Sequence, residues 1–373
     1  MESMDMFDAN HLYDRLQVLE SQDRPLTEKE RLKAMNGPLL HWYGNNARIL
    51  PWRENPLPYR VWISEIMLQQ TRVEAVKPYF ERFMAALEDV KALSEVPEEQ
   101  LLKLWEGLGY YNRARNLKKA AEMIVSQYDG VIPSEYEELL KLPGIGSYTA
   151  GAIASIAYGK PYPAVDGNVL RVISRVTASK EDILRQSVKK RFEQALMETM
   201  PKEAASAFNQ GLIEIGAIVC VPNGPPKCES CPLSSICLAH KENLTGEIPF
   251  KARKKPRRIE ERTVLVIERA GQVAIRKRDD TGLLAALYEL PSLDGRVDAG
   301  TVLRELSLSE DDVVNIETLP DAKHIFSHVE WHMSGLRVTL RKEAPDVFLM
   351  VEKEALSERY PLPNAFAAYR KLL

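Results

Sequence analysis

The sequence predicts two domains: a mainly α-helical N-terminal domain followed by a smaller α+β domain. Three observations support this prediction. Residues 31–240 carry apolar residues at helical spacing, with almost no strand-like alternation. After residue 262, short β-branched runs appear at 263–267, 272–276 and 335–340. All four cysteines of the chain fall within 18 residues, which indicates one shared site rather than scattered structural thiols.

Length and composition narrow the class of protein. The chain has 373 residues, of which 45% are hydrophobic, so it can build a sizeable core in two or three domains of ~150 residues each. Wholesale disorder and a disulfide-stapled mini-protein are therefore excluded. No apolar run approaches the ~20 residues of a membrane helix, and the N-terminus is acidic where a signal peptide would be basic. We expect a cytoplasmic protein in a reducing compartment.

The charge pattern divides the chain into four segments. Residues 1–30 hold eight acidic and three basic side chains, which suggests an acidic N-terminal extension. Residues 31–240, the predicted helical domain, hold 25 basic and 23 acidic side chains. Residues 241–262 hold eight basic and four acidic side chains and are interpreted as a basic linker. Residues 263–373 form the α+β domain, with helical patterns near 298–307 and 352–357 and a hairpin turn at 270–271. The net charge of −3 hides this distribution and does not exclude a nucleic-acid partner.

The segment LPGIGSYTA at 142–150 lies between two helical patterns. Gly144 and Gly146 permit a tight turn whose backbone N–H groups, with the start of the next helix, can bind a phosphate. This pattern indicates a helix-hairpin-helix, and phosphate contacts of this kind position a protein on DNA without reading its sequence. An ordinary corner between two helices is the alternative.

Two carboxyl groups are predicted to occupy different environments. Glu65 lies in an apolar helical stretch with Trp62, Ile66 and Met67, where lost hydration would raise its pKa and keep it protonated as a general acid requires. Asp166 precedes a helix that begins near residue 168, and a helix N-terminus stabilises the anion. Such pairs recur in glycosidic bond cleavage. The alternatives are a Glu65 paired with Arg60 or Arg72 and an Asp166 that only caps its helix.

The four cysteines are spaced C-x7-C-x2-C-x5-C at Cys220, Cys228, Cys231 and Cys237. Four clustered thiolates predict one metal site, and spacing alone leaves tetrahedral zinc and an iron–sulfur cluster equally open. Either would fix the loop between residues 221 and 236, in which Lys227 can approach DNA phosphate.

From about residue 31 to the C-terminus, the chain resembles the MutY family of adenine DNA glycosylases in the endonuclease III-like helix-hairpin-helix superfamily. The motifs that carry the resemblance are PWR at 51–53, SEIMLQQT at 64–71, GLGYYNRARN at 107–116, LPGIGSYTAG at 142–151, VDGNVLRV at 165–172, FNQGLIEIGA at 208–217 and the cysteine cluster. The family removes adenine mispaired with 8-oxoguanine in double-stranded DNA.

The resemblance implies roles for individual residues. Glu65 would protonate the extruded adenine, and Asp166 would stabilise the oxocarbenium-like sugar before water completes hydrolysis, the base being flipped out because its leaving nitrogens are inaccessible in the duplex. Tyr148 and Asn168 match positions that support these two carboxyls. Further matched positions line the adenine pocket or contact DNA: Trp52, Arg53 and Gln210 for the pocket, and Gln70, Thr71, Leu108, Gly109 and Tyr110 around the lesion.

Other features of the family concern the reaction type and the cofactor. Bifunctional relatives have a lysine where this chain has Tyr148, so we expect a monofunctional glycosylase that leaves an abasic site. The family's four cysteines hold one [4Fe-4S] cluster, although the first spacing here is seven residues where six are expected. The extra residue falls between Cys220 and Cys228, in a loop rich in proline.

Leu108 and Tyr110 would by default be core residues, and only the motif match suggests insertion into DNA.

The C-terminal domain resembles the Nudix-like recognition domain of the family. Arg304 and Glu305 are not followed by the second acidic pair of a hydrolytic Nudix motif, so we expect no pyrophosphate hydrolysis. Phe326, Ser327 and His328 match the loop that reads the lesion. Ser327 could bond the Hoogsteen edge of 8-oxoguanine, which carries an N–H where guanine has an acceptor; a serine that caps a strand end is the alternative.

Two other functions compete with a monomeric adenine glycosylase. A glycosylase with lyase activity on oxidised pyrimidines is disfavoured by Tyr148 and by the added C-terminal domain. A DNA-binding protein without enzymatic activity is disfavoured by the joint presence of Glu65 and Asp166.

Overall fold

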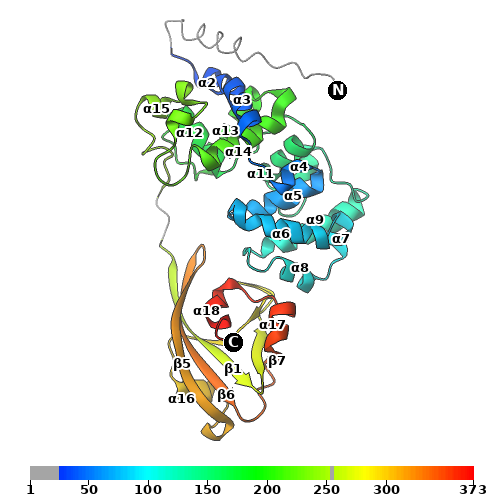
Figure 1. Ribbon diagram of the computed structural model, residues 1–373, viewed down its shortest axis with the longest axis vertical. Coiled ribbons are helices and arrows are strands. Elements are labelled where there is room, and N and C mark those ends of the chain that lie inside the picture. Colours follow the sequence, from blue (N-terminus) through cyan, green and yellow to red (C-terminus); the bar gives the residue numbers. More distant parts are fainter. Residues whose placement is uncertain (1–24, 253–255) are drawn as a thin grey trace. The chain divides into compact units, whose positions relative to one another are not determined.

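The computed structural model describes residues 25–252 and 256–373, which form two compact units (Figure 1). Unit 1 comprises residues 25–95 and 116–252, and unit 2 comprises residues 96–115 and 256–373. Most of the predicted acidic extension lies outside the described residues, as does part of the basic linker. In the part of the chain that is described, no helix combines the length and the apolarity that crossing a membrane requires.

Unit 1 is helical. Its helices are α2 (Glu28–Ala34), α3 (Asn36–Asn46), α4 (Pro51–Glu54), α5 (Pro58–Leu68), α6 (Val73–Ala86), α7 (Val90–Glu95), most of α9 (Asn112–Gln127), α10 (Tyr136–Leu139), α11 (Ser147–Ala152), the π-helical turn η1 (Ile153–Ala157), α12 (Gly167–Val176), α13 (Gln186–Thr199), the 3-10 turn η2 (Lys202–Ala204), α14 (Ala205–Ile218), the 3-10 turns η3 (Cys228–Ser230) and η4 (Ser234–Ile236), and α15 (Leu238–Lys241). The predicted helical class of this domain is confirmed.

Helices α12 and α14 are central to one apolar core of unit 1. Phe208, Leu212 and Ile215 of α14 are fully buried against residues of α12, α13 and α3. Gly151 and Gly216 allow close approaches that a side chain would block. A Cβ on Gly151 would lie 2.2 Å from the Pro163 carbonyl oxygen, and a Cβ on Gly216 would lie 2.5 Å from the Cβ of Asn168. These contacts bring α11 and α14 against the segment that carries Asp166.

Unit 2 contains a mixed sheet with the order β3-β2-β1-β6-β5, to which β4 and β7 add at β1 and β2. The strands are β1 (Arg258–Arg269), β2 (Gln272–Lys277), β3 (Tyr288–Glu289), β4 (Ser292–Asp294), β5 (Val313–Ile325), β6 (Val329–Leu340) and β7 (Leu349–Glu352). Strands β1 and β6 run parallel and every other pair is antiparallel. The predicted α+β class of this domain is confirmed.

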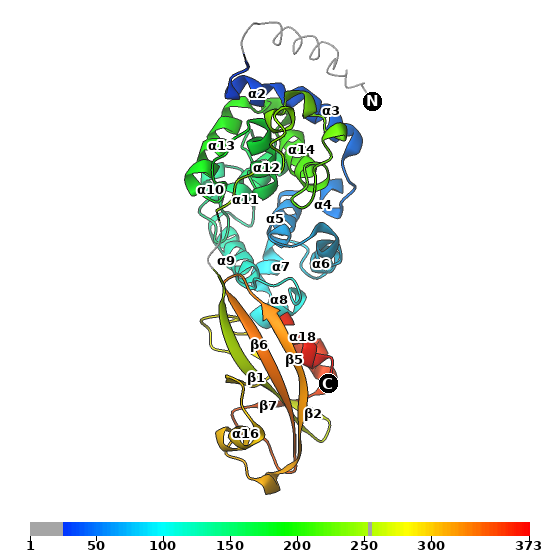
Figure 2. The same ribbon diagram turned by 90° about the vertical axis from the view of Figure 1, so that its left-hand side faces the viewer.

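The sheet buries both faces because successive side chains of a strand point to opposite sides. Val264 and Val266 of β1 face a core completed by η6 (Asn364–Phe366) and α18 (Ala367–Arg370), whereas Leu265 and Ile267 face a core completed by α16 (Ala299–Glu305). Figure 2 shows α16 and α18 on opposite sides of the strands. The remaining elements of unit 2 are α8 (Glu98–Leu104), the 3-10 turn η5 (Glu310–Asp312) and α17 (Lys353–Arg359).

The predicted hairpin turn forms between β1 and β2. Glu268 pairs with Val273 and Arg269 with Gln272. The two turn residues, Ala270 and Gly271, have φ values of 48° and 86°, as a two-residue hairpin turn requires.

The close approach at Gly151 yields a stability prediction. Gly151→Ala should lower the free energy of unfolding by about 1–3 kcal/mol because the new methyl group overlaps backbone atoms of Pro163. Gly44→Ala is the matched control: it lies in α3 with nothing within 4 Å of the added Cβ, so helix propensity should raise stability by roughly 0.5–1 kcal/mol. Denaturant unfolding of both variants would measure the difference. A Gly151→Ala protein as stable as the parent would contradict the close packing of α11.

Candidate active site

Unit 1 encloses a cavity of about 520 Å³ between α5, the start of α11, the start of α12 and one face of α14. Ten of the residues singled out from the sequence line it: Trp52, Arg53, Glu65, Gln70, Thr71, Gly146, Tyr148, Asp166, Asn168 and Gln210. The structure therefore brings together side chains that are up to 158 positions apart in the sequence, counted from Trp52 to Gln210. It does not place Leu108, Tyr110 or the loop 326–328 in this cavity, since they belong to unit 2.

Glu65 lies on α5, a helix in which eight of the eleven residues are buried. The side chain of Glu65 faces the cavity and accepts a hydrogen bond of 2.5 Å from the Tyr148 hydroxyl. Burial raises the pKa of Glu65 to about 7, against the lowering effect of the Tyr148 hydrogen bond, and the charge of Asp166 adds to the rise. A carboxyl with this pKa is substantially protonated at neutral pH, so it can donate a proton to a bound molecule.

Asp166 caps α12. Its Oδ1 accepts hydrogen bonds from the backbone N–H groups of Asn168 (2.9 Å) and Val169 (2.8 Å), and its Oδ2 accepts one of 2.7 Å from the Asn168 side chain. These three bonds favour the anion. Burial nevertheless raises the pKa of Asp166 above its ordinary value, so the predicted contrast between the two carboxyls is smaller than expected. Asp166 is both a helix cap and a cavity residue, so the two sequence interpretations are compatible.

A chain of hydrogen bonds joins Asp166 to the cysteine segment through Arg171. The Arg171 guanidinium donates to the Asn168 side-chain oxygen (2.8 Å), to the Gly216 carbonyl (2.6 Å) and to the Cys220 carbonyl (2.7 Å). Asn168 in turn donates to Asp166. Sequence reasoning missed Arg171, although its place in VDGNVLRV, one helical turn after Asn168, was a usable signal.

A buried ion-pair group supports the opposite wall of the cavity. Glu214 is fully buried and accepts hydrogen bonds from Arg48 (2.6 and 2.9 Å) and from Arg53 (2.9 Å). Despite burial, these two guanidinium groups hold the pKa of Glu214 at about 2. Glu214 follows Gln210 by one helical turn on α14, so both side chains reach the same cavity. The sequence analysis missed Glu214 and Arg48. An acidic residue within an apolar helix gives no local signal of the arginine that pairs with it, when that arginine is 166 positions away.

The turn of the predicted helix-hairpin-helix lies between α10 and α11. Gly144 has a φ of 78°, and a Cβ there would lie 2.7 Å from the Cβ of Asn116. Gly146 is the N-cap residue of α11, and both glycines are exposed. The turn thus presents backbone to solvent directly beside Ser147 and Tyr148, which line the cavity.

The four cysteines lie around the end of α14 and the start of α15, and each is partly exposed. Burial raises the pKa of Cys231 to about 12, and the nearby Cys220, Cys228 and Cys237 add to the rise. Arg175 donates a hydrogen bond of 3.1 Å to the Cys220 sulfur. Among the residues that the structure describes, no group of three or more His, Cys, Asp or Glu side chains is arranged to hold a metal ion. The donor set, four neighbouring thiols beside a cation, fits a group that binds thiolates and carries net negative charge.

Two of the segments singled out for DNA contact, the loops 326–328 and 108–110, lie in unit 2, whereas Gln70, Thr71, Gly144 and Gly146 lie in unit 1. Phe326, Ser327 and His328 join β5 to β6, and the Phe326 N–H donates to the Val329 carbonyl (2.9 Å). Ser327 and His328 are exposed, whereas the Phe326 ring packs edge-on against Trp331. In the second loop Tyr110 is 48% exposed but Leu108 is only 7% exposed. Leu108 therefore packs as a core residue in this conformation, which is its default interpretation.

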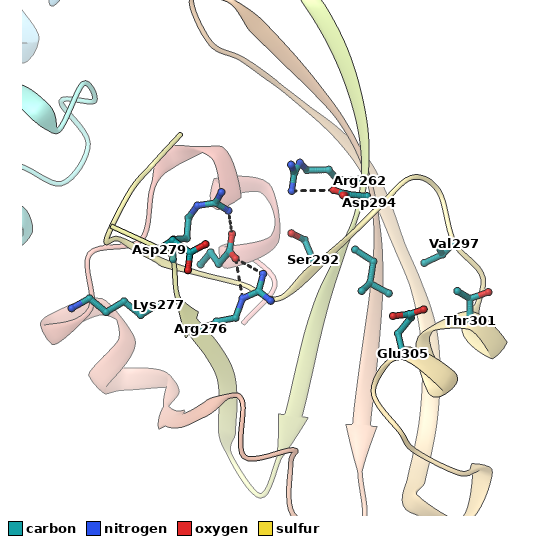
Figure 3. Close-up of a pocket in the computed structure, with 12 residues that line it drawn as sticks. Arg262, Arg276, Lys277, Asp279, Ser292, Asp294, Val297, Thr301 and Glu305 are labelled. Carbon is teal, nitrogen blue, oxygen red and sulfur yellow. Dashed lines mark hydrogen bonds and ion pairs between the residues drawn. The ribbon is translucent and has the colours of Figure 1, made fainter. Parts of the chain in front are cut away.

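Unit 2 also contains a cavity of about 650 Å³ between β1, β2 and α16 (Figure 3). Glu289 is buried there and pairs with Arg276 (2.7 Å) and Arg278, while Arg262 pairs with Asp294. Glu305 of α16 lines the same cavity. Its charged side chains are thus mostly neutralised by one another.

Comparisons with known proteins agree with this geometry. A family described as HhH-GPD superfamily base excision DNA repair protein matches residues 63–201, and a NUDIX domain matches residues 263–372. Among solved structures, the chain is similar to a non-covalent endonuclease III–DNA complex, with a TM-score of 0.51 and 29% sequence identity. The alignment covers 59% of this chain and 99% of that protein. The fold and the cavity with its two carboxyls thus define a DNA glycosylase of the helix-hairpin-helix class.

The relatives narrow this class. An adenine DNA glycosylase of Buchnera aphidicola subsp. Acyrthosiphon pisum (strain APS) is 34% identical over 305 residues, which is 81% of this chain and 85% of that protein. The adenine DNA glycosylase of Homo sapiens is 31% identical over 390 aligned positions, covering 88% of this chain and 71% of that protein. This chain belongs to the adenine DNA glycosylase family.

The hydrogen bond between Tyr148 and Glu65 predicts how the carboxyl titrates. A hydroxyl that donates to a carboxylate stabilises the charged form, so Tyr148→Phe should raise the pKa of Glu65 above its value of about 7. Carbon-13 NMR titration of labelled glutamate carboxyls would measure this shift, with Glu65→Gln identifying the resonance.

Tyr158→Phe is the matched control for this titration, because the Tyr158 hydroxyl donates instead to the Ile132 carbonyl. It should leave the Glu65 titration unchanged. A downward shift of the Glu65 pKa in Tyr148→Phe would contradict the assigned hydrogen bond.

Proposed function

We propose that this protein excises adenine paired with 8-oxoguanine from double-stranded DNA, hydrolysing the N-glycosidic bond and leaving an abasic site. One observation carries the proposal: Glu65, a buried carboxyl with a pKa of about 7, lies in the same cavity as the hydrogen-bonded carboxyl of Asp166. The family membership supplies adenine as the base. Solved relatives in complex with DNA support DNA as the partner.

In the proposed reaction, Glu65 gives its proton to the extruded adenine, which makes the base a neutral leaving group. As the bond between base and sugar breaks, the sugar gains positive charge, and the Asp166 carboxylate stabilises that charge. Water then adds to the sugar carbon and gives its proton to the Glu65 carboxylate, which restores the acid for the next cycle. Tyr148 orients Glu65, and Asn168 orients Asp166, each through the hydrogen bond described above.

The adenine pocket is formed, in this proposal, by Trp52, Arg53 and Gln210. Trp52 is buried, with its ring edge-on to Phe80 at 5.5 Å between centroids. Glu214 fixes the Arg53 guanidinium, so this cation enters the pocket at a defined position. A side chain held in this way loses little conformational entropy when a base binds.

The opposite base is proposed to be read by unit 2. Ser327 is exposed at the tip of the β5–β6 hairpin, where its hydroxyl can accept a hydrogen bond from the N–H that distinguishes 8-oxoguanine from guanine. Gln70 and Thr71 beside the cavity, and Tyr110 with Leu108 and Gly109, would fill the space left by the extruded adenine. The exposed turn at Gly144 and Gly146 would bind a DNA phosphate. A cytoplasmic monomer that acts on the nucleoid fits this activity.

The decisive experiment uses a duplex that contains adenine opposite 8-oxoguanine. We expect strand breaks only after alkali, because Tyr148 has no amine that could form a Schiff base and cleave the strand. Glu65→Gln should lower the single-turnover rate by about 100- to 10,000-fold while the protein still binds the duplex.

A duplex with adenine opposite thymine is the control for this assay and should remain intact. Breaks without alkali would indicate a bifunctional lyase. An absence of breaks in both conditions, with binding retained, would indicate a DNA-binding protein without this activity.

We propose that Cys220, Cys228, Cys231 and Cys237 hold one [4Fe-4S] cluster of structural role. The supporting features are the clustered thiols and the hydrogen bond from Arg175 to the Cys220 sulfur, since donors to cluster sulfur stabilise negative charge. Freshly purified protein should absorb visible light and contain four iron atoms per chain. Colourless protein with one zinc atom per chain would contradict the cluster, and Cys231→Ser should abolish the absorbance.

A further inference from the structure

The segment 96–115 lies within the sequence of the catalytic domain but packs in unit 2 with the C-terminal residues. Arg370 of α18 pairs with Glu106 at 2.7 Å, and the Asn364 side chain donates to the Gly107 carbonyl at 3.2 Å. Lys103 completes the group by bonding Glu106 (2.6 Å) and the Tyr360 carbonyl (3.3 Å). The Glu106 side chain is 14% exposed, so solvent screens this ion-pair group less than an open surface pair.

These contacts anchor a strained loop. Gly107, Gly109 and Tyr110 have φ values of 100°, 71° and 48°, a conformation that side chains disfavour and that neighbouring contacts must maintain. Inside the loop, Arg113 donates to the carbonyls of Leu108 and Gly109 at 3.0 Å each. The Gly107 carbonyl, in contrast, accepts from Asn364, 257 positions away.

The C-terminal turn is linked to the loop 326–328 through Trp331 of β6. Asn364 begins the turn η6, which ends at the fully buried Phe366. The Phe366 ring lies 6.1 Å from the Trp331 ring, and the Trp331 ring lies 4.9 Å from the Phe326 ring, measured between centroids and edge-on in both cases. A continuous row of packed side chains therefore runs from the β5–β6 hairpin tip to the anchor of loop 106–110.

We propose that Asn364 and Arg370 are positioning residues that couple the reading of the opposite base to the insertion of loop 106–110 into DNA. Contact of the hairpin tip with the lesion fixes Phe326, the aromatic row fixes η6, and η6 holds the loop in the shape that presents Tyr110. Docking of the correct opposite base then favours the conformation from which adenine is extruded. The coupling rests on the proposed function, because that function names the base pair that is recognised. The anchor of loop 106–110 is independent of the proposed function.

A charge exchange tests the anchor. Arg370→Glu should break the pair with Glu106. The double variant Glu106→Arg with Arg370→Glu should restore an ion pair between the two positions, but only partly restore the anchor, because the new arginine lies beside Lys103. Arg296→Glu is the matched control, since Arg296 also lies in unit 2 but pairs with Asp321, at 3.0 Å, instead of with Glu106. Hydrogen exchange of the amides of 105–110 in the free protein is the first measurement. We expect about fivefold faster exchange in Arg370→Glu, partial recovery in the double variant and no change in the control.

The second measurement is the single-turnover rate of adenine release opposite 8-oxoguanine divided by the rate opposite guanine. Arg370→Glu should lower this ratio by about 3- to 10-fold, and the double variant should recover part of the loss. Ser327→Ala gives the reference for lost reading of the lesion. Asn364→Ala removes the other anchor without a charge change and should act in the same direction, so the test remains available if Arg370→Glu does not fold.

The outcomes separate the two proposals. Unchanged exchange in both Arg370→Glu and Asn364→Ala overturns the anchor. Faster exchange with an unchanged ratio overturns the coupling and leaves a purely structural contact. If the parent protein does not release adenine opposite 8-oxoguanine, the proposed function fails and the coupling fails with it, while the exchange measurement still decides whether the anchor exists.

Discussion

The start of α12 is the constraint on which the cavity of unit 1 depends. Asp166 caps the N-terminus of this helix by accepting two backbone hydrogen bonds, and the same carboxyl faces the cavity. Its rotation is therefore set by the helix rather than by solvent, and Asn168 and Arg171 extend that control to α14 and to the cysteine segment. Gly216 lets α14 approach closely enough for the Arg171 bonds to form. A carboxyl fixed in this way needs little reorganisation when positive charge develops beside it.

The two glutamates of the cavity, Glu214 and Glu65, have opposite pKa shifts because their hydrogen-bond partners differ. Glu214 stays ionised because two guanidinium groups surround it, and its pKa falls to about 2. Glu65 meets a neutral hydroxyl instead, so burial dominates and its pKa rises to about 7. Two glutamates in one cavity thus differ in how readily they hold a proton. Glu214 remains an anion that anchors Arg53, whereas Glu65 is substantially protonated at neutral pH and can donate its proton. The partner, more than burial itself, decides the role.

Local sequence signals predicted much of the fold and of the site. The helical and strand-forming parts of the chain and the hairpin at Ala270 follow from periodicity and local motifs. The grouping of Glu65, Tyr148 and Asp166, which lie in three separate motifs, was implied by the resemblance to the glycosylase family. What escaped prediction depends on distant partners. The pairing of Arg48 with Glu214 and the link from Arg171 to Cys220 each join a helix to a loop that is far away in the sequence. The raised pKa of Asp166 escaped for a related reason: its capping bonds can be foreseen locally, but the depth of burial that outweighs them is a property of the whole unit.

The packing of residues 96–115 with the C-terminal residues limits how far the two domains of the chain can be changed independently. The family match at 63–201 runs through this segment, so the boundary of the inherited module and the boundary of the folded unit do not coincide. The pair of Glu106 with Arg370 joins the two modules within one folded unit, so a change of charge on one module would alter a contact of the other. The two modules are then no longer interchangeable parts, and exchanging the C-terminal domain between distant homologues would also require exchanging α8 and its loop.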